Sequence, residues 1–287
     1  MSYAIAYYIV LKEGNYIYKD HSEFKLPLNE DEKIWRYLDF TKFVSLLCNH
    51  SLFFCRADEI AKLDRFEGTF SSASIKALIS ATNTKKPDED YETLKQMFGL
   101  LTRALRKCTV ISCWHKSEIE SDAMWKLYVN NGLGVAIQST TKNLKESFKD
   151  YADNSINIGL VNYIDYDFMN LLNKTQMNIF TLFMNKREGF SHENELRALI
   201  SRFNGAEIMK LINELKSHSH LSENDFNNSI FKGNGLYVPT NLDILIEKVV
   251  VCPIAPKWFN ELVQAIVIKY NLNKEVVPSS LIGDPIE

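Results

Sequence analysis

Two glutamates and an arginine alternate along the segment Glu193-Asn-Glu-Leu-Arg197, which leads into the apolar residues Leu199 and Ile200. Side chains of a β-strand point to alternate faces, so a strand here places Glu193, Glu195 and Arg197 on one face. Burying these groups is costly unless they pair with one another or bind a ligand. The pattern therefore predicts a catalytic or binding site, and the alternative is a solvated edge strand.

A second group of reactive side chains ends the apolar strand that we predict at residues 109–111. Ser112, Cys113, Trp114 and His115 follow it, and the ends of strands are where folds often place chemistry. Cys113 and His115 would share a strand face, which permits a thiol–imidazole pair, but the sequence offers no third group to orient the imidazole.

Aromatic residues follow on a short predicted helix for which Asp122 is the expected N-cap. Trp125 and Tyr128 are three residues apart and therefore lie on one face of that helix. Gly132 and Gly134 then predict a turn into a return strand. This unit is interpreted either as a pocket wall or as ordinary core packing, since aromatic residues at helical spacing are often core.

Charged candidates also lie on other predicted elements. Arg36 falls on a short strand, Arg56 ends a strand, and Asp64 lies in an acidic and aromatic turn. Lys186 opens the charged segment that continues to Arg197. We expect Asp64, Lys186 and Arg197 to contact substrate. A metal-dependent nuclease or phosphoesterase, built from Asp64, Glu67 and Lys186, is a further hypothesis.

The elements that must position these groups predict one α+β domain over residues 1–287. Its expected core, residues 34–282, is a mixed and largely antiparallel sheet with flanking helices and a helical insertion at residues 72–107. Alternating and apolar runs predict further strands, and 3.6-residue periodicity predicts further helices. The strands include residues 3–10, 158–163, 236–238, 248–252 and 275–277, and the helices include residues 207–216 and 256–270.

Composition limits the class of protein. A hydrophobic fraction of 46% is typical of a folded globule, and a net charge of -3 gives no global attraction for nucleic acid. The 5 cysteines show no C-x-x-C pairing, which favours reduced thiols and no metal site. No apolar run is long enough to span a bilayer, so we expect a cytoplasmic protein without a membrane partner. The chain contains no G-x-G-x-x-G, P-loop, G-x-S-x-G or H-E-x-x-H motif.

The order of these landmarks resembles the bacterial family known as domain of unknown function 2971 (DUF2971), over roughly residues 34–282. Its most specific parts here are Met124-Trp-x-x-Tyr128 and Glu193-x-Glu195-x-Arg197. The family usually has an Asn-Asp-Pro-Phe turn, whereas this chain has Leu63-Asp-Arg-Phe66, which puts a role for the turn proline in doubt but not one for Asp64. The landmarks that carry the resemblance are the Arg36 strand, Leu52–Phe54, Asp64–Gly68, Ser112–His115, Met124–Tyr128, Val161–Tyr163, Lys186, Glu193–Arg197, Val250–Pro253 and Trp258.

More distantly, the pattern resembles the mono-ADP-ribosyltransferase fold, and within it the toxin branch that modifies nucleic-acid bases. That resemblance implies NAD as the substrate and a role in a toxin or a phage-defence effector. It implies an arginine that holds the dinucleotide phosphates, here Arg36 or Arg56.

The same resemblance implies a nicotinamide wall and a catalytic glutamate. Ser112, Trp125 and Tyr128 match the wall, with His115 beside them. Glu195, or else Glu193, would stabilise an oxocarbenium-like transition state.

Two other functions stay open. One is a non-catalytic protein that senses a nucleotide or a partner with the same residues, and the other is the metal-dependent nuclease. A nucleic acid or a protein is the expected acceptor if the chain is a transferase. The enzyme hypothesis requires Arg36, Ser112 and Glu195 to come together in the folded chain.

Overall fold

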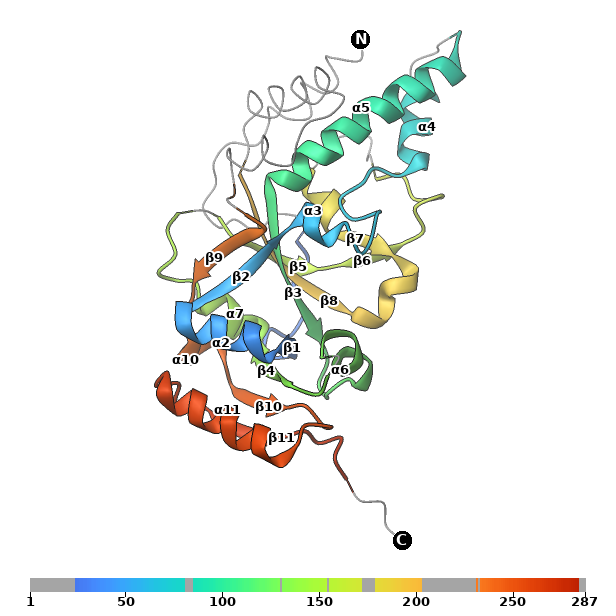
Figure 1. The fold of residues 1–287 in the computed structure, drawn as a ribbon. Coiled ribbons are helices and arrows are strands. Elements are labelled where there is room, and N and C mark those ends of the chain that lie inside the picture. Colours follow the sequence, from blue (N-terminus) through green and yellow to red (C-terminus); the bar gives the residue numbers. More distant parts are fainter. Residues whose placement is uncertain are drawn as a thin grey trace.

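The computed structural model of the chain describes residues 24–80, 85–129, 131–153, 155–171, 179–202, 231 and 233–283 (Figure 1). The strand predicted at residues 3–10 and the helix predicted at residues 207–216 lie outside these described residues. Within them, every helix is too short or too polar to cross a lipid bilayer.

Nine strands of the described chain form one sheet in the order β11-β10-β4-β1-β3-β2-β9, with β8 paired to β3 and β5 paired to β8. The pair β10–β11 is parallel and the other pairs of this sheet are antiparallel, which confirms the predicted α+β class with a mixed, largely antiparallel sheet. The strands are β1 (Lys33–Asp39), β2 (Ser51–Arg56), β3 (Thr109–Lys116), β4 (Gly134–Thr140), β5 (Asn157–Leu160), β8 (Glu195–Ser201), β9 (Gly235–Pro239), β10 (Lys248–Val251) and β11 (Glu275–Pro278).

The largest core cluster covers one face of this sheet. It joins apolar side chains of the sheet to helices α2 (Phe40–Asn49), α7 (Thr141–Glu146), α10 (Leu242–Leu245) and α11 (Lys257–Lys269), which lie in the lower half of Figure 1. Val110 and Trp114 of β3 point into this cluster. Burial of such side chains is the main favourable contribution to folding.

Two smaller clusters cover the opposite face. Ile111 of β3 packs with α3 (Ala57–Ile60), α4 (Ser72–Ser80) and α5 (Pro87–Lys107), whereas Trp35 of β1 packs with α6 (Asp122–Tyr128). Because successive strand residues alternate in direction, Ile111, Cys113 and His115 share this face of β3. Cys113 and His115 therefore lie between the α5 cluster and the α6 cluster, and both are half-buried.

Most residues of the predicted insertion 72–107 form α4 and α5, which project from the sheet at the upper right of Figure 1. Helix α5 begins with Pro87 and an acidic first turn, and it ends with Arg106 and Lys107. Pro is well suited to the first turn, and both sets of charge complement the helix dipole.

Strand β3 has an incompletely paired edge at its centre, and we call this interruption the split. Along one edge β3 pairs with β8 from Thr109 to His115. Along the other edge β2 pairs only with residues 110–111, and β1 only with residues 115–116. The side chain of Arg36 reaches across the split from β1, where its Nη2 donates to the carbonyl of Phe53 in β2 at 2.8 Å. A backbone acceptor in the interrupted part of the sheet thereby gains a partner.

Two local predictions were wrong. Ser121, rather than Asp122, caps α6, and its hydroxyl accepts from the backbone N–H of Met124 at 3.4 Å. Glu193 is not on the strand of Glu195, because it belongs to the 3-10 helix η2 (Glu188–Glu193). Asn194, with φ 38, ends that helix in the left-handed conformation and turns the chain into β8.

Two glycines give opposite stability predictions. An added Cβ at Gly134 would lie 2.5 Å from the carbonyl oxygen of Leu38 in the neighbouring strand, whereas one at Gly99 in α5 meets nothing within 4 Å. We expect Gly134→Ala to lower the free energy of unfolding by about 1–3 kcal/mol. Gly99→Ala should raise it by up to about 1 kcal/mol, because Gly disfavours helix. Urea unfolding of both variants checks these predictions. If Gly134→Ala left the free energy of unfolding unchanged, the close approach of β4 and β1 would be contradicted.

Candidate functional site

A buried arginine is the centre of the charged cluster. The side chain of Arg197 is 0% exposed, and its two terminal nitrogens donate to the carboxylate of Glu67 at 2.7 and 2.9 Å. Its Nη1 also donates to the carbonyl of Phe183 at 2.6 Å, and its Nε to Glu195 at 2.6 Å. Burial alone would lower the pKa of Arg197, but Glu195 and Glu67 hold it well above its usual value.

Glu67 reaches Arg197 because the loop after α3 folds tightly over the 3-10 helix η1 (Ile179–Phe183). Gly68 has φ +64, and a Cβ there would lie 2.5 Å from the Phe183 ring, so only glycine fits without movement. Arg106 of α5 fastens the same loop by donating from Nε to the Glu67 carbonyl at 2.6 Å.

Lys186 joins the two glutamates of the sequence motif. It lies on the short strand β7 (Asn185–Arg187), which pairs in parallel with β6 (Asn162–Ile164). Its ammonium donates to Oε1 of Glu195 at 2.9 Å and also to Oε2 of Glu193. Glu193 and Glu195 are therefore neighbours although only Glu195 belongs to β8, and we call them the acidic pair.

The two carboxyl groups of the acidic pair have opposite electrostatic surroundings. Burial would raise the pKa of Glu195, but Arg197 and Lys186 outweigh it and hold that pKa far below its usual range. Burial, together with the neighbouring Glu195 carboxylate, raises the pKa of Glu193 to about 8. The two carboxyl groups therefore titrate as a coupled pair in which Glu193 keeps its proton to higher pH than Glu195.

His115 lies next to the acidic pair, where β3 and β8 place it opposite Glu195. Its Nδ1 is 2.6 Å from the carbonyl oxygen of Glu193, so Nδ1 carries the proton and Nε2 is left as an acceptor. Burial lowers the pKa of His115, which keeps the imidazole neutral.

Arg36 and Ser112 meet at the split, on the face of β3 that carries Trp114. Glu195, the third residue that the enzyme hypothesis requires, lies on the other face, opposite His115. The Oγ of Ser112 accepts from Nη1 of Arg36 and from Nε1 of Trp114, the latter at 3.1 Å. Ser112 is 0% exposed, so its hydroxyl bonds to Arg36 rather than to solvent. Arg36 itself is half-buried.

Tyr128 interacts electrostatically with groups at the split and with the acidic pair. Its side chain is 45% exposed, and it interacts electrostatically with Cys113 and with both glutamates. Arg36 interacts in the same way with Cys113 and Tyr128. Cys113 and Tyr128 thus lie within electrostatic range of both Arg36 and the acidic pair, whereas Arg36 itself bonds to Ser112 and to the carbonyl of Phe53.

Three predicted residues lie apart from this group or have other partners. Arg56 forms a forked pair with Asp58, at 2.5 and 3.0 Å, and donates to the Gly233 carbonyl at 2.7 Å. Trp125, on the buried face of α6, donates from Nε1 to Glu120 at 3.1 Å. Asp64 accepts from Arg187 at 2.8 Å near the acidic pair. The predicted roles of these residues stay predictions.

Sequence reasoning missed Tyr163 and Phe53. The hydroxyl of Tyr163 accepts from the backbone N–H of Glu195 at 2.8 Å and so positions the start of β8. Its place in the Val161-Asn-Tyr163 landmark was the available signal. Phe53 acts through its backbone carbonyl, which no side-chain pattern reveals.

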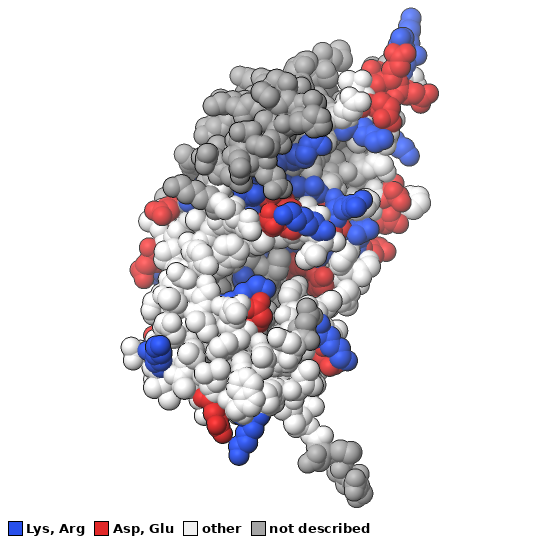
Figure 2. All heavy atoms as spheres, in the orientation of Figure 1, with Lys and Arg blue, Asp and Glu red and all other residues white. Residues whose placement is uncertain are grey.

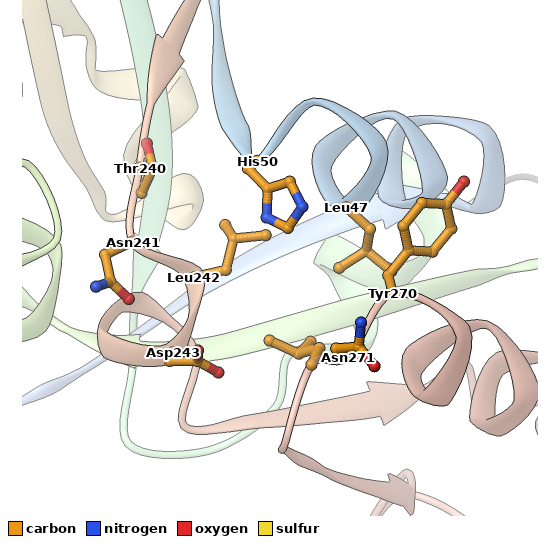
Figure 3. Close-up of a pocket in the computed structure, with 9 residues that line it drawn as sticks. Leu47, His50, Thr240, Asn241, Leu242, Asp243, Tyr270 and Asn271 are labelled. Carbon is orange, nitrogen blue, oxygen red and sulfur yellow. The ribbon is translucent and has the colours of Figure 1, made fainter.

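A surface hollow lies far from these residues in the fold, where the ends of α2 and α11 meet α10 (Figure 3). Its volume is about 190 Å³, below the roughly 300–1,000 Å³ of typical ligand pockets. It is lined by Leu47, His50, Thr240, Asn241, Leu242, Asp243, Tyr270, Asn271 and Leu272. In the described ranges no set of three or more His, Cys, Asp or Glu side chains is arranged to hold a metal ion.

The raised pKa of Glu193 predicts a pH-dependent stability. Its ordinary pKa is 4.5 and its folded value is about 8, so between these values the folded chain retains a proton that the unfolded chain loses. The free energy of unfolding should therefore fall as pH rises from 5 to 8, and Glu193→Gln should remove this contribution. Urea midpoints from pH 5 to 9 check this, with the exposed Glu188→Gln as control. Parallel curves for wild type and Glu193→Gln would refute the assignment.

Cys113 should be an unreactive thiol. Burial and the carboxylate of Glu195 raise the pKa of Cys113 well above its usual value, and the thiolate is the reactive form. At pH 8 we expect iodoacetamide to label the exposed Cys48 well before Cys113, as followed by peptide mass spectrometry. Faster labelling of Cys113 would revive the thiol–imidazole interpretation.

The comparisons with known proteins give one family. Residues 124–198 match the model described as "Protein of unknown function (DUF2971)", a segment that contains Tyr128, Lys186, the acidic pair and Arg197. No curated protein and no solved structure matches the chain. This match supports the resemblance to DUF2971 that the sequence predicts, and over residues 124–198 the chain is similar to that family of unknown function.

Proposed function

We propose that the chain is an enzyme that breaks an N-glycosidic bond of a nucleotide, with NAD as the substrate that the distant resemblance implies. The observation that carries the proposal is the acidic pair on Lys186, two carboxyl groups whose surroundings shift their pKa values in opposite directions. Glycosyl-transfer enzymes commonly use two carboxyl groups whose surroundings give them different protonation states.

Each carboxyl group has a distinct role in this proposal. The ionised Glu195 places negative charge where the ribose develops positive charge, as the C1′–N bond breaks and its electron pair leaves with neutral nicotinamide. The protonated Glu193 donates a hydrogen bond to a ribose hydroxyl. An acceptor oxygen or nitrogen then forms the new bond to C1′, and Nε2 of the neutral His115 takes its proton.

Glu193 is the more accessible member of the acidic pair. Its side chain is 12% exposed, against 6% for Glu195, whose two oxygens are bonded to Lys186 and Arg197. We therefore infer that Glu193 contacts the substrate and that the more buried Glu195 acts on it electrostatically. The exposed Tyr128 borders the side from which a dinucleotide would approach, and Arg36 lies at the split with Ser112.

A second candidate function is a non-catalytic sensor of a nucleotide or partner. It is favoured by the internal pairing of the cluster, because Arg197, Lys186 and Glu195 satisfy one another inside the protein. Ion pairs of this kind also occur in purely structural networks.

Nicotinamide release from labelled NAD tests the proposal. Wild type should release nicotinamide, and Glu193→Ala should reduce the rate by about a hundredfold or more, because it removes the carboxyl group that donates to the ribose hydroxyl. Glu188→Gln, an exposed change in the same 3-10 helix, should leave the rate unaltered.

Circular dichroism of each variant separates lost chemistry from lost folding. Wild type that binds NAD without releasing nicotinamide would favour the sensor. Wild type that neither binds nor cleaves NAD would end the proposal for this nucleotide.

A further inference from the structure

Arginine and phenylalanine side chains gather beside the acidic pair, on the loop after α3, the end of α5 and the segment after β7. Figure 2 shows Lys and Arg side chains over the lower part of α5 and the neighbouring α3. We call this surface the arginine patch, and it consists of Arg65, Phe66, Arg103, Arg106, Arg187 and Phe190.

The patch is held together by contacts of its own. The guanidinium of Arg187 lies 4.6 Å from the centre of the Phe66 ring and 5.2 Å from that of Phe190. Arg106 donates from Nη2 to the carbonyl of Arg65 at 2.7 Å, which fixes the loop against α5. Arg103 lies one turn earlier on α5 and is exposed, as are Arg65 and Phe66.

The patch continues into the candidate site. The ring of Phe190 lies 4.6 Å from the ammonium of Lys186, which binds both members of the acidic pair. A ligand lying across Phe66, Arg187 and Phe190 would therefore end beside Glu193.

Acidic side chains limit where an anion can lie. Asp64 is buried and already bonded to Arg187. The exposed Asp165 and Asp167 flank Tyr166, whose ring packs on Phe66 at 5.3 Å, and the exposed Glu188 follows Arg187. These carboxylates flank the patch beside Tyr166 and after Arg187, so an anion is favoured on its Arg65 and Arg103 side.

We propose that the arginine patch binds single-stranded nucleic acid and presents it to the acidic pair. Arginines bind phosphate oxygens, and accessible aromatic rings stack with bases of any sequence. The exposed Phe66 and the half-buried Phe190 among these arginines therefore suit an unpaired strand. An acidic peptide would use the arginines but has no bases for the rings. This inference goes beyond the proposed function, because binding requires neither NAD nor catalysis.

Fluorescence anisotropy with labelled twelve-nucleotide single-stranded DNA and RNA tests the proposal, without NAD. We expect binding that weakens with salt, and the exposed double change Arg65→Ala/Arg103→Ala should reduce the slope of log affinity against log salt by about 1.4. Phe66→Leu should weaken binding about fivefold or more through lost stacking. Because the assay contains no NAD, its result is separate from that of the nicotinamide-release assay.

Lys126→Ala/Lys149→Ala is the matched control, since both lysines are exposed and lie outside the patch. It should leave the affinity and the salt slope close to those of wild type. Equal losses in the two double variants would show general electrostatics and overturn the proposal. Full competition by polyglutamate, equal affinity for duplex DNA, or no binding at low salt would also overturn it.

Discussion

The charged interior depends on one constraint, which is that a wholly buried guanidinium must be fully paired. Arg197 donates to the carboxylate of Glu67 in the loop after α3, to that of Glu195 on its own strand and to the carbonyl of Phe183 in η1. Breaking a buried pair of this kind costs about 3–5 kcal/mol, because the remaining charge is left unpaired. The positions of Glu67 and Glu195, and through Lys186 that of Glu193, all follow from this pairing.

The split in the sheet is the second determinant of the site. β3 keeps one edge fully paired to β8, so the strand stays straight enough to carry Cys113 and His115 past the acidic pair. The other edge is divided between β1 and β2, and the side chain of Arg36 bridges the division. At this opening Arg36, Cys113 and His115 are half-buried, while Trp114 remains buried in the core.

Local patterns predicted much of the fold and the members of the acidic pair, but not their arrangement. Apolar runs located the strands, and Glu195 and Arg197 share a face as period two requires. Glu193 joins them through Lys186 and a left-handed Asn194 rather than through strand alternation. The partnership of Glu67 with Arg197 spans 130 positions, and no periodicity reports contacts of that separation.

That long separation governs when the site forms. Contacts between residues distant in sequence require closure of a long loop, which opposes early formation. Glu67 cannot pair with Arg197 until β8 has been synthesised and paired. Gly68, the next residue, packs closely on the ring of Phe183 in the same region. The acidic pair therefore forms only after β8 has been synthesised and paired, so a nascent or shortened chain lacking β8 carries no assembled site.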